Sequence, residues 1–79
     1  MKVQLKLFAI YRNYLPPAAE GSAIHVQVPP NTRVSDLLRQ FGLPENGSRI
    51  VLINGLGTRE DQVLQENDVV AAFPAMAGG

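Results

Sequence analysis

The sequence lacks cysteine and tryptophan, has no excess of either charge and contains no long hydrophobic run. Without cysteine, the chain cannot form disulfides, thiolate zinc sites or iron–sulfur clusters, and it has no cysteine nucleophile. Seven basic residues balance seven acidic ones, which argues against a domain built to neutralise nucleic-acid phosphates. The longest apolar stretch, from Val69 to Ala77, is interrupted by Pro74 and falls well short of the roughly 20 residues of a membrane-spanning helix.

The N-terminus alternates polar and apolar residues and has no signal-peptide core. We therefore expect a soluble, cytoplasmic chain that neither enters a membrane nor binds nucleic acid, since its basic residues are dispersed. With 79 residues the chain should form a single domain over 1–79, whose core is too small to enclose a deep pocket.

Alternation with a period of two over residues 2–10 predicts a half-buried first strand. The residues expected on its core side are Val3, Leu5, Leu7 and Ala9. Phe8 and Ile10 then project from the opposite face, where an apolar pair is a candidate docking surface for a partner. The alternative is that they are two scattered exposed apolar residues, which are common.

A loop over 11–22, with two prolines and a glycine, separates this strand from a second alternating segment. In that segment Ile24, Val26 and Val28 should face the core, with His25 and Gln27 on the opposite face. Helical periodicity follows Pro30, and its apolar stripe comprises Val34, Leu37, Leu38 and Phe41. Thr32 is the expected N-cap of this helix, and Gly42 with Pro44 should end it.

Residues 50–53 form an unbroken apolar run that predicts an interior strand, and Asn54-Gly55 predicts a tight turn. A short strand is expected at 63–64 and a last strand at 69–73, ended by Pro74. The resulting order predicts an α+β domain of ubiquitin-like β-grasp type. It would have a mixed sheet of four to five strands with one main helix on one face.

Residues 74–79 should form a protruding tail that ends in Gly78 and Gly79. Two glycines leave the terminal carbonyl sterically unhindered, and the uncharged segment before them differs from an ordinary solvated tail. We expect this tail to insert into a partner protein, whereas a frayed terminus with accidental glycines is the alternative. The expected partner-binding residues are Phe8, Ile10, Phe73, Pro74, Ala75, Met76 and Ala77.

Five motifs, in their order along the chain, carry a resemblance to a known family. They are Lys6-Leu7-Phe8-Ala9, Val34-Ser35-Asp36-Leu37-Leu38, Ile53-Asn54-Gly55, Leu64-Gln65-Glu66-Asn67-Asp68-Val69-Val70 and Phe73-Pro74-Ala75-Met76-Ala77-Gly78-Gly79. Together they resemble the ubiquitin-like sulfur carriers, most closely the small subunit of molybdopterin synthase and its thiamine-pathway relative. The family usually has glycine where Asn67 stands, threonine where Arg33 stands, and proline-valine in place of Ala75-Met76.

The resemblance implies a carrier whose Gly79, preceded by Gly78, is adenylated by a ubiquitin-activating-type enzyme that uses ATP. The acyl-adenylate is then converted to a thiocarboxylate that donates sulfur in molybdopterin biosynthesis. The chain would be the non-catalytic small subunit of a hetero-oligomeric molybdopterin synthase, whose large subunit supplies the catalytic groups. No permanently bound cofactor and no metal are expected.

Other functions stay open. The sulfur acceptor could be a thiazole, tRNA or another product, or Gly79 could form an isopeptide bond as a ubiquitin-like modifier. A structural adaptor is less favoured than the sulfur carrier and the modifier. An enzyme acting alone is the least favoured function, because the only histidine, His25, is expected on the outward side of a strand and has no triad spacing. A paired-carboxylate site within 60–68 has no supporting motif. The carboxylates expected only to solubilise helix start, loop and turn are Asp36, Glu60, Asp61, Glu66 and Asp68.

Overall fold

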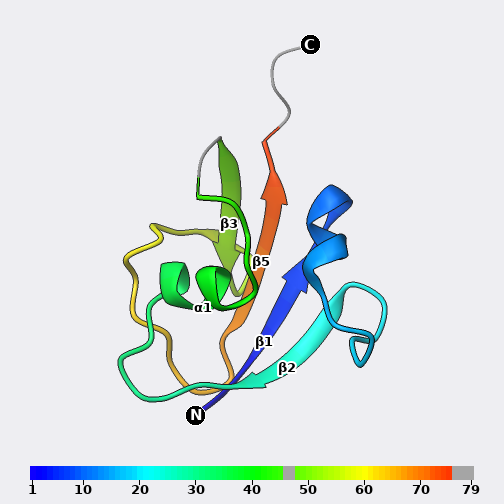
Figure 1. Cartoon of the computed structure of the whole chain (residues 1–79). Coiled ribbons are helices and arrows are strands. Elements are labelled where there is room, and N and C mark those ends of the chain that lie inside the picture. Colours follow the sequence, from blue (N-terminus) through cyan, green and yellow to red (C-terminus); the bar gives the residue numbers. More distant parts are fainter. Residues whose placement is uncertain (46–47, 76–79) are drawn as a thin grey trace.

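The computed structural model describes residues 1–45 and 48–75, which form a mixed sheet with one short α-helix lying across one face (Figure 1). Its strands are β1 (Lys2–Leu7), β2 (Ala23–Gln27), β3 (Arg49–Ile53), β4 (Leu56–Gly57) and β5 (Val69–Pro74). The helices are the 3-10 helix η1 (Ala9–Tyr14) and the α-helix α1 (Val34–Gln40). The sheet order is β2-β1-β5-β3-β4, with β1 and β5 parallel at its centre. This is the predicted β-grasp arrangement.

The core lies between α1 and one face of the sheet. The alternation predicted for β1 places Val3, Leu5 and Leu7 in this core, and α1 contributes Leu37 and Leu38. Parallel pairing of β1 with β5 sets Leu5 beside Val70 and Leu7 beside Ala72, and all four are fully buried. The periodicity of the sequence therefore identifies the core side of β1 correctly.

The first strand is shorter than predicted. β1 ends at Leu7, Phe8 stays extended, and Ala9 adopts a φ of 56° that turns the chain into η1. The prediction of a strand over 2–10 was therefore wrong beyond Phe8, and Ala9 is exposed rather than buried. Tyr11 from η1 enters the core instead. Because no glycine marks the bend, the alternating pattern hides it.

The helix begins one residue later than the predicted cap implies. Its N-cap is Arg33, whose backbone N–H donates to Asp36 Oδ2 at 3.0 Å. Thr32 was predicted to be the cap, but its hydroxyl donates to the Pro29 carbonyl at 2.7 Å and is therefore engaged in the preceding turn. The prediction was wrong because a local side chain-to-backbone bond competes for the same hydroxyl.

The predicted turn at Asn54-Gly55 is confirmed, with φ values of 52° and 86°, and it joins β3 to β4. The short strand expected at 63–64 is wrong, since Val63 makes only an isolated bridge with Arg33. The short strand is β4 instead. Within the described residues, no helix has the length and hydropathy needed to cross a membrane.

The turn before β5 uses asparagine in the left-handed region. Asn67 has a φ of 70°, so asparagine takes the conformation that glycine more often supplies. The Asp68 carboxylate accepts hydrogen bonds from the Gln65 backbone at 2.8 Å and from the Asn54 side chain at 3.1 Å. These bonds hold the entry of β5 against the β3–β4 turn.

Candidate functional site

The face of the sheet opposite α1 carries an apolar cluster that no helix covers. The members of this open-face patch are Phe8, Ile50, Leu52, Ala71 and Phe73. Antiparallel register sets Ile50 beside Phe73 and Leu52 beside Ala71, and their neighbours along the strands point into the core. Phe8 is 38% exposed and Ile50 44% exposed, so the patch offers side chains that a partner could cover.

Phe8 joins this patch although it follows the end of β1. Its backbone N–H donates to the Ala72 carbonyl at 3.1 Å, which keeps Phe8 alongside β5. The rings of Phe8 and Phe73 then meet edge to face, with centroids 6.1 Å apart and an interplanar angle of 78°. Aromatic pairs of this geometry hold each other in place, so the patch is preorganised at its centre.

One side of the patch is positively charged. Lys6 lies beside Ala71 in the sheet, and Lys2 occupies the same face of β1. Among the strand positions that the structure describes, this face carries no aspartate or glutamate. A partner surface that is apolar at its centre and acidic beside Lys6 would complement it.

The patch is continuous with the point where the C-terminal segment leaves the sheet. Pro74, the last residue of β5, pairs with Arg49, and the Ala75 N–H donates to the Ser48 carbonyl at 3.1 Å. Phe73 therefore belongs to the patch while the next two residues are held against the start of β3. We call residues 73–75 the tail root.

A largely buried arginine fastens the tail root to the rest of the domain. The Arg49 guanidinium is 9% exposed, donates through Nε and Nη2 to the Glu60 carboxylate, and donates through Nη1 to the Pro44 carbonyl at 2.6 Å. The hydrogen bonds to Glu60 raise the pKa of Arg49, and the same bonds lower the pKa of Glu60. Both groups are therefore held in their charged forms.

The predicted partner-binding residues do not all lie in one place. Phe8 and Phe73 meet in the patch, and Pro74 and Ala75 continue from it. Ile10 is 65% exposed, but it lies on η1 rather than on the strand from which it was expected to project. The predicted contacts of Met76 and Ala77, and the expected reactive glycines Gly78 and Gly79, lie outside the described residues.

Sequence reasoning missed Ile50, Leu52 and Ala71 as members of the patch, and it missed the pairing of Arg49 with Glu60. The unbroken run at 50–53 was interpreted as an interior strand, which it is, with β5 on one side and β4 on the other. A single helix covers only one sheet face, so alternate residues of such a run must be uncovered. That signal was available in the sequence.

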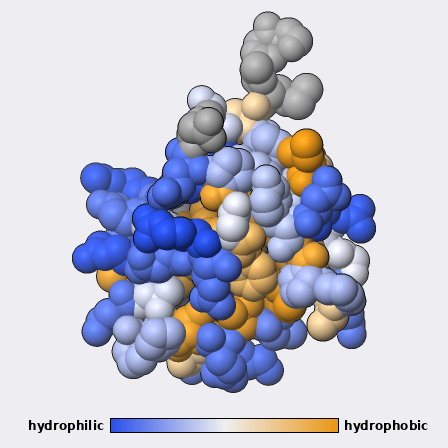
Figure 2. All heavy atoms as spheres, viewed as in Figure 1, coloured by the Kyte–Doolittle hydropathy of each residue, from blue (hydrophilic) through white to orange (hydrophobic). Residues whose placement is uncertain are grey.

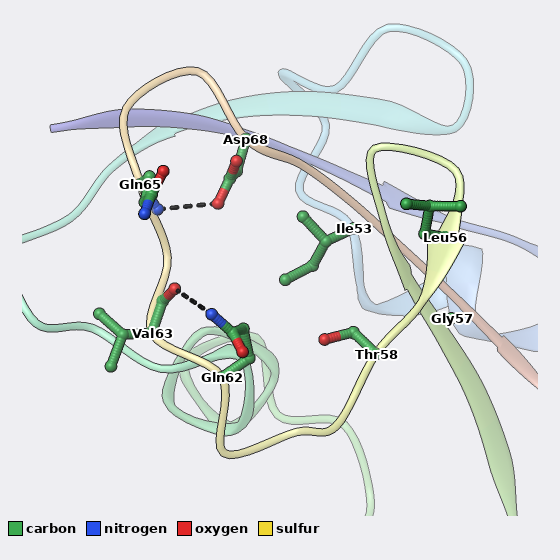
Figure 3. Close-up of a pocket in the computed structure, with 8 residues that line it drawn as sticks. All are labelled: Ile53, Leu56, Gly57, Thr58, Gln62, Val63, Gln65 and Asp68. Atoms are coloured by element: carbon green, nitrogen blue, oxygen red, sulfur yellow. Dashed lines mark hydrogen bonds between the residues drawn. The ribbon is translucent and has the colours of Figure 1, made fainter.

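A shallow pocket of about 270 Å³ lies at the far end of β3 from the tail root (Figure 3). Ile53 and Leu56 supply its apolar side, and Gln62, Gln65 and Asp68 supply polar groups. Two of these groups are already engaged, because the Gln65 backbone donates to Asp68 and the Gln62 side chain donates to the Val63 carbonyl at 3.4 Å. The pocket therefore offers few free polar groups to a ligand.

The titratable residues form no reactive cluster in the described part of the chain. His25 lies exposed on β2 opposite Gln4, near the end of the sheet where β5 begins rather than at the tail root. No group of three histidine or carboxylate side chains within 1–45 and 48–75 has the spacing of a metal site. Glu60 differs from the predicted solubilising role, since it pairs with Arg49.

Comparison with known proteins adds to this geometry. The sequence model of the ThiS family matches residues 5–79, which is nearly the whole chain. No curated protein matches the sequence.

Solved structures with the same fold include SAMP1 from Haloferax volcanii, at a TM-score of 0.71 and 22% identity over 100% of both chains. A second structure of the small archaeal modifier protein 1 of H. volcanii has a TM-score of 0.73 and 21% identity, over 95% of this chain and 98% of that one. The "Putative molybdopterin converting factor, subunit 1" from Pyrococcus furiosus has a TM-score of 0.71 and 26% identity, over 95% and 98% of the two chains.

Proposed function

Because the chain belongs to the ThiS family of ubiquitin-like proteins, we propose that it carries sulfur as a thiocarboxylate on Gly79. We further propose that it donates this sulfur in molybdopterin biosynthesis, as the small subunit of molybdopterin synthase. The observation that carries the proposal is the continuity of the open-face patch with the tail root, in a family member whose sequence ends in Gly78-Gly79. A partner that covers the patch also meets the tail root at residues 73–75.

The chemistry follows from the reactivity of a carboxylate. The Gly79 carboxylate becomes electrophilic when one of its oxygens attacks the α-phosphate of ATP on an adenylating enzyme and displaces pyrophosphate. A sulfur nucleophile at the oxidation level of hydrogen sulfide then attacks the acyl carbon, AMP leaves, and loss of the S–H proton gives the thiocarboxylate. The chain's own residues dock the partner and orient the tail: Phe8 and Phe73 supply the apolar contact, and Lys6 pairs with an acidic group of the partner. Arg49 holds the tail root through its pairing with Pro74.

The preference for the molybdopterin branch is supported by Phe73-Pro74 before the tail and by the fold shared with the Pyrococcus furiosus protein. A second candidate function is conjugation of Gly79 to lysines of other proteins. The likeness to the small archaeal modifier protein 1 structures favours this candidate. Both functions begin with adenylation of the same carboxylate, so they differ only in the nucleophile that displaces AMP.

Intact mass spectrometry of the chain isolated from its native cells separates the two functions. A sulfur carrier should show a species heavier by about 16 Da, because sulfur replaces one oxygen of the C-terminal carboxylate. A variant with one alanine added after Gly79 serves as the matched control and should lack this species. A ladder of larger conjugates without the 16 Da species would instead establish the modifier.

The pathway assignment needs a separate measurement. In cells lacking the endogenous chain, the wild-type protein should restore molybdopterin formation, and the alanine-extended variant should not. Full restoration by the extended variant would overturn the sulfur-carrier proposal, because no free Gly79 carboxylate would then be needed. Restoration of thiamine formation alone would overturn the molybdopterin assignment.

A further inference from the structure

The outer edge of β2 presents backbone groups that no described residue satisfies. At one end of the β1–β2 pair, Val28 and Met1 exchange hydrogen bonds of 2.8 Å and 2.7 Å. At the other end, the Leu7 N–H donates to the Ser22 carbonyl at 2.9 Å. Hydrogen-bonded pairs alternate along an antiparallel ladder, so the N–H and C=O of His25 and Gln27 point away from β1.

The neighbouring strand confirms this alternation. The N–H groups of Gln4 and Phe8 donate across to β5, to the carbonyls of Asp68 and Ala72. Gln4 is the register partner of His25, so this pair exchanges no ladder hydrogen bonds. The backbone of His25 is therefore directed to the free edge of the sheet.

This free segment is bounded at both ends. Ala23, the next residue whose backbone points outward, exchanges hydrogen bonds of 2.9 Å and 3.0 Å with Glu20. In the other direction Pro29 has no N–H to donate. The strand between them, Ala23–Gln27, contains neither proline nor a charged side chain of the kinds that usually protect an edge from pairing.

We propose that this edge pairs with the same edge of a second copy of the chain, in an antiparallel register centred on Val26. In this register His25 lies opposite Gln27 of the second copy, and Gln27 lies opposite His25 of the second copy. Each of these residues donates its N–H and accepts at its C=O, so every free group finds a partner. Val26 lies opposite its own equivalent.

Side-chain chemistry favours a second copy as the occupant. On the helix side the register sets Val26 against Val26 and Ile24 against Val28, so apolar residues meet apolar residues. On the open side it sets His25 against Gln27, and the lysines stay one strand away on β1. Figure 2 shows hydrophobic surface on the helix side, beside α1, which the added strand would extend. A strand of another protein would need apolar residues on the helix side and polar residues on the open side at the same positions. A second copy has this arrangement by symmetry.

The paired copies would share one continuous sheet about a two-fold axis perpendicular to it. Both open-face patches would lie on the same side, and the two β5 strands would end at opposite ends of the assembly. The patch and the tail root therefore stay accessible, and self-pairing does not depend on the proposed function. Because only His25 and Gln27 of each copy exchange hydrogen bonds across the edge, the contact should be smaller than the roughly 1,000 Å² of a stable interface, and the association should be weak and concentration-dependent.

Disulfide trapping tests the register. Because the native sequence has no cysteine, every disulfide must involve the introduced residues. His25→Cys and Gln27→Cys are made separately, one is labelled with heavy nitrogen, and the two are mixed and mildly oxidised. Opposed residues of a hydrogen-bonded pair lie about 5.5 Å apart at Cα, within disulfide reach, whereas like residues lie about 7–8 Å apart diagonally. The ratio of the mixed disulfide to the two like disulfides should exceed its random value severalfold in mass spectra.

Gln40→Cys mixed with Gln62→Cys, at exposed positions on α1 and a loop, provides the collision control and should give random proportions. Random proportions for the His25 and Gln27 pair would overturn the proposal. Sedimentation equilibrium at high concentration supplies an independent readout. The wild-type and Phe8→Asp proteins should dimerise equally, and loss of the dimer in Phe8→Asp would place the contact on the open-face patch and overturn the edge pairing.

Discussion

The two faces of the sheet are built from the same strands, but one face is buried under α1 and the other is exposed to solvent. On the helix side, Leu5, Val51 and Val70 point into the core with other apolar residues and are buried beneath α1. On the open side, Phe8, Ile50 and Phe73 are equally apolar but have no helix over them. Apolar residues on the covered side stabilise the fold, whereas those on the open side are available to a partner. One sheet thus separates stability from recognition.

The largest effect on stability should come from shortening the same residue type on the covered side. Leu5→Ala should lower the free energy of unfolding by about 2–5 kcal/mol, because the buried side chain leaves a cavity. Leu52→Ala on the open side is the matched control and should lower the free energy of unfolding by less than about 1.5 kcal/mol, because the partly exposed Leu52 side chain buries less apolar surface than Leu5. Urea denaturation measures both, and equal losses would contradict the division between the faces.

The open side should show the opposite balance. Phe8→Asp should weaken binding to the adenylating enzyme or the large synthase subunit by about 2 kcal/mol or more, because it places a charge in an apolar contact. The midpoint of thermal unfolding should change little. Ile10→Asp is the control, since Ile10 is more exposed but lies off the sheet on η1. Titration calorimetry and thermal melts, run in parallel, would refute the division if Phe8→Asp lost stability but kept binding.

The ion pair between Arg49 and Glu60 lies on the helix side of the sheet and makes the stability depend on pH. Glu60→Gln should lower the free energy of unfolding by about 1–2 kcal/mol at neutral pH. This value is near the low end for hydrogen bonds to charged groups, because Glu60 is one-third exposed. Urea denaturation gives this value. Asp61→Asn is the control, because its contact with Arg59 is largely exposed and should contribute almost nothing.

The sign of the pH effect follows from the carboxylate. Arg49 lowers the pKa of Glu60 in the folded state, so folding favours the ionised form. The resulting stability is fully present above the ordinary glutamate pKa and is lost as the pH falls through the lowered one. The difference between wild type and Glu60→Gln should therefore shrink in acid. A difference that stayed constant from neutral pH to below the ordinary glutamate pKa would mean that the charge contributes nothing.

The smallest effect should come from the bend between β1 and the patch. Ala9→Gly should raise the free energy of unfolding by about 0.5–1 kcal/mol, because alanine is strained at a φ of 56°. Asn67→Gly, at a φ of 70°, should stay within about 0.5 kcal/mol of wild type, because asparagine tolerates this region. Chemical denaturation that ranked the two substitutions the other way would show that Ala9 carries no strain.

Much of the fold could be predicted because its signals are local. The alternation of β1, the stripe of α1 and the turn at Asn54-Gly55 each follow from a few neighbouring residues. The errors fell where a local signal was missing or ambiguous. No glycine marks the bend at Ala9, and the Thr32 hydroxyl had two acceptable uses, of which the structure adopts the bond to Pro29.

The candidate site was only partly predictable, for a related reason. Phe8 and Phe73 could be named from strand parity and from the apolar segment before the terminus. Ile50, which completes their cluster, could not be joined to them without knowing that β5 lies between β1 and β3. The pairing of Arg49 with Glu60 depends on a loop whose path has no periodicity to read.

By itself the sequence determined the core side of β1 and of α1, and it determined the absence of any thiol. These properties follow from periodicity and composition, which need no distant contact. Only the tertiary structure decided that residues 8, 50 and 73 form one surface, and that Arg49 holds the root of the tail. The physical reason is that strand order arises from pairing between distant segments, and the parallel pairing of β1 with β5 sets the first and last strands of the chain side by side.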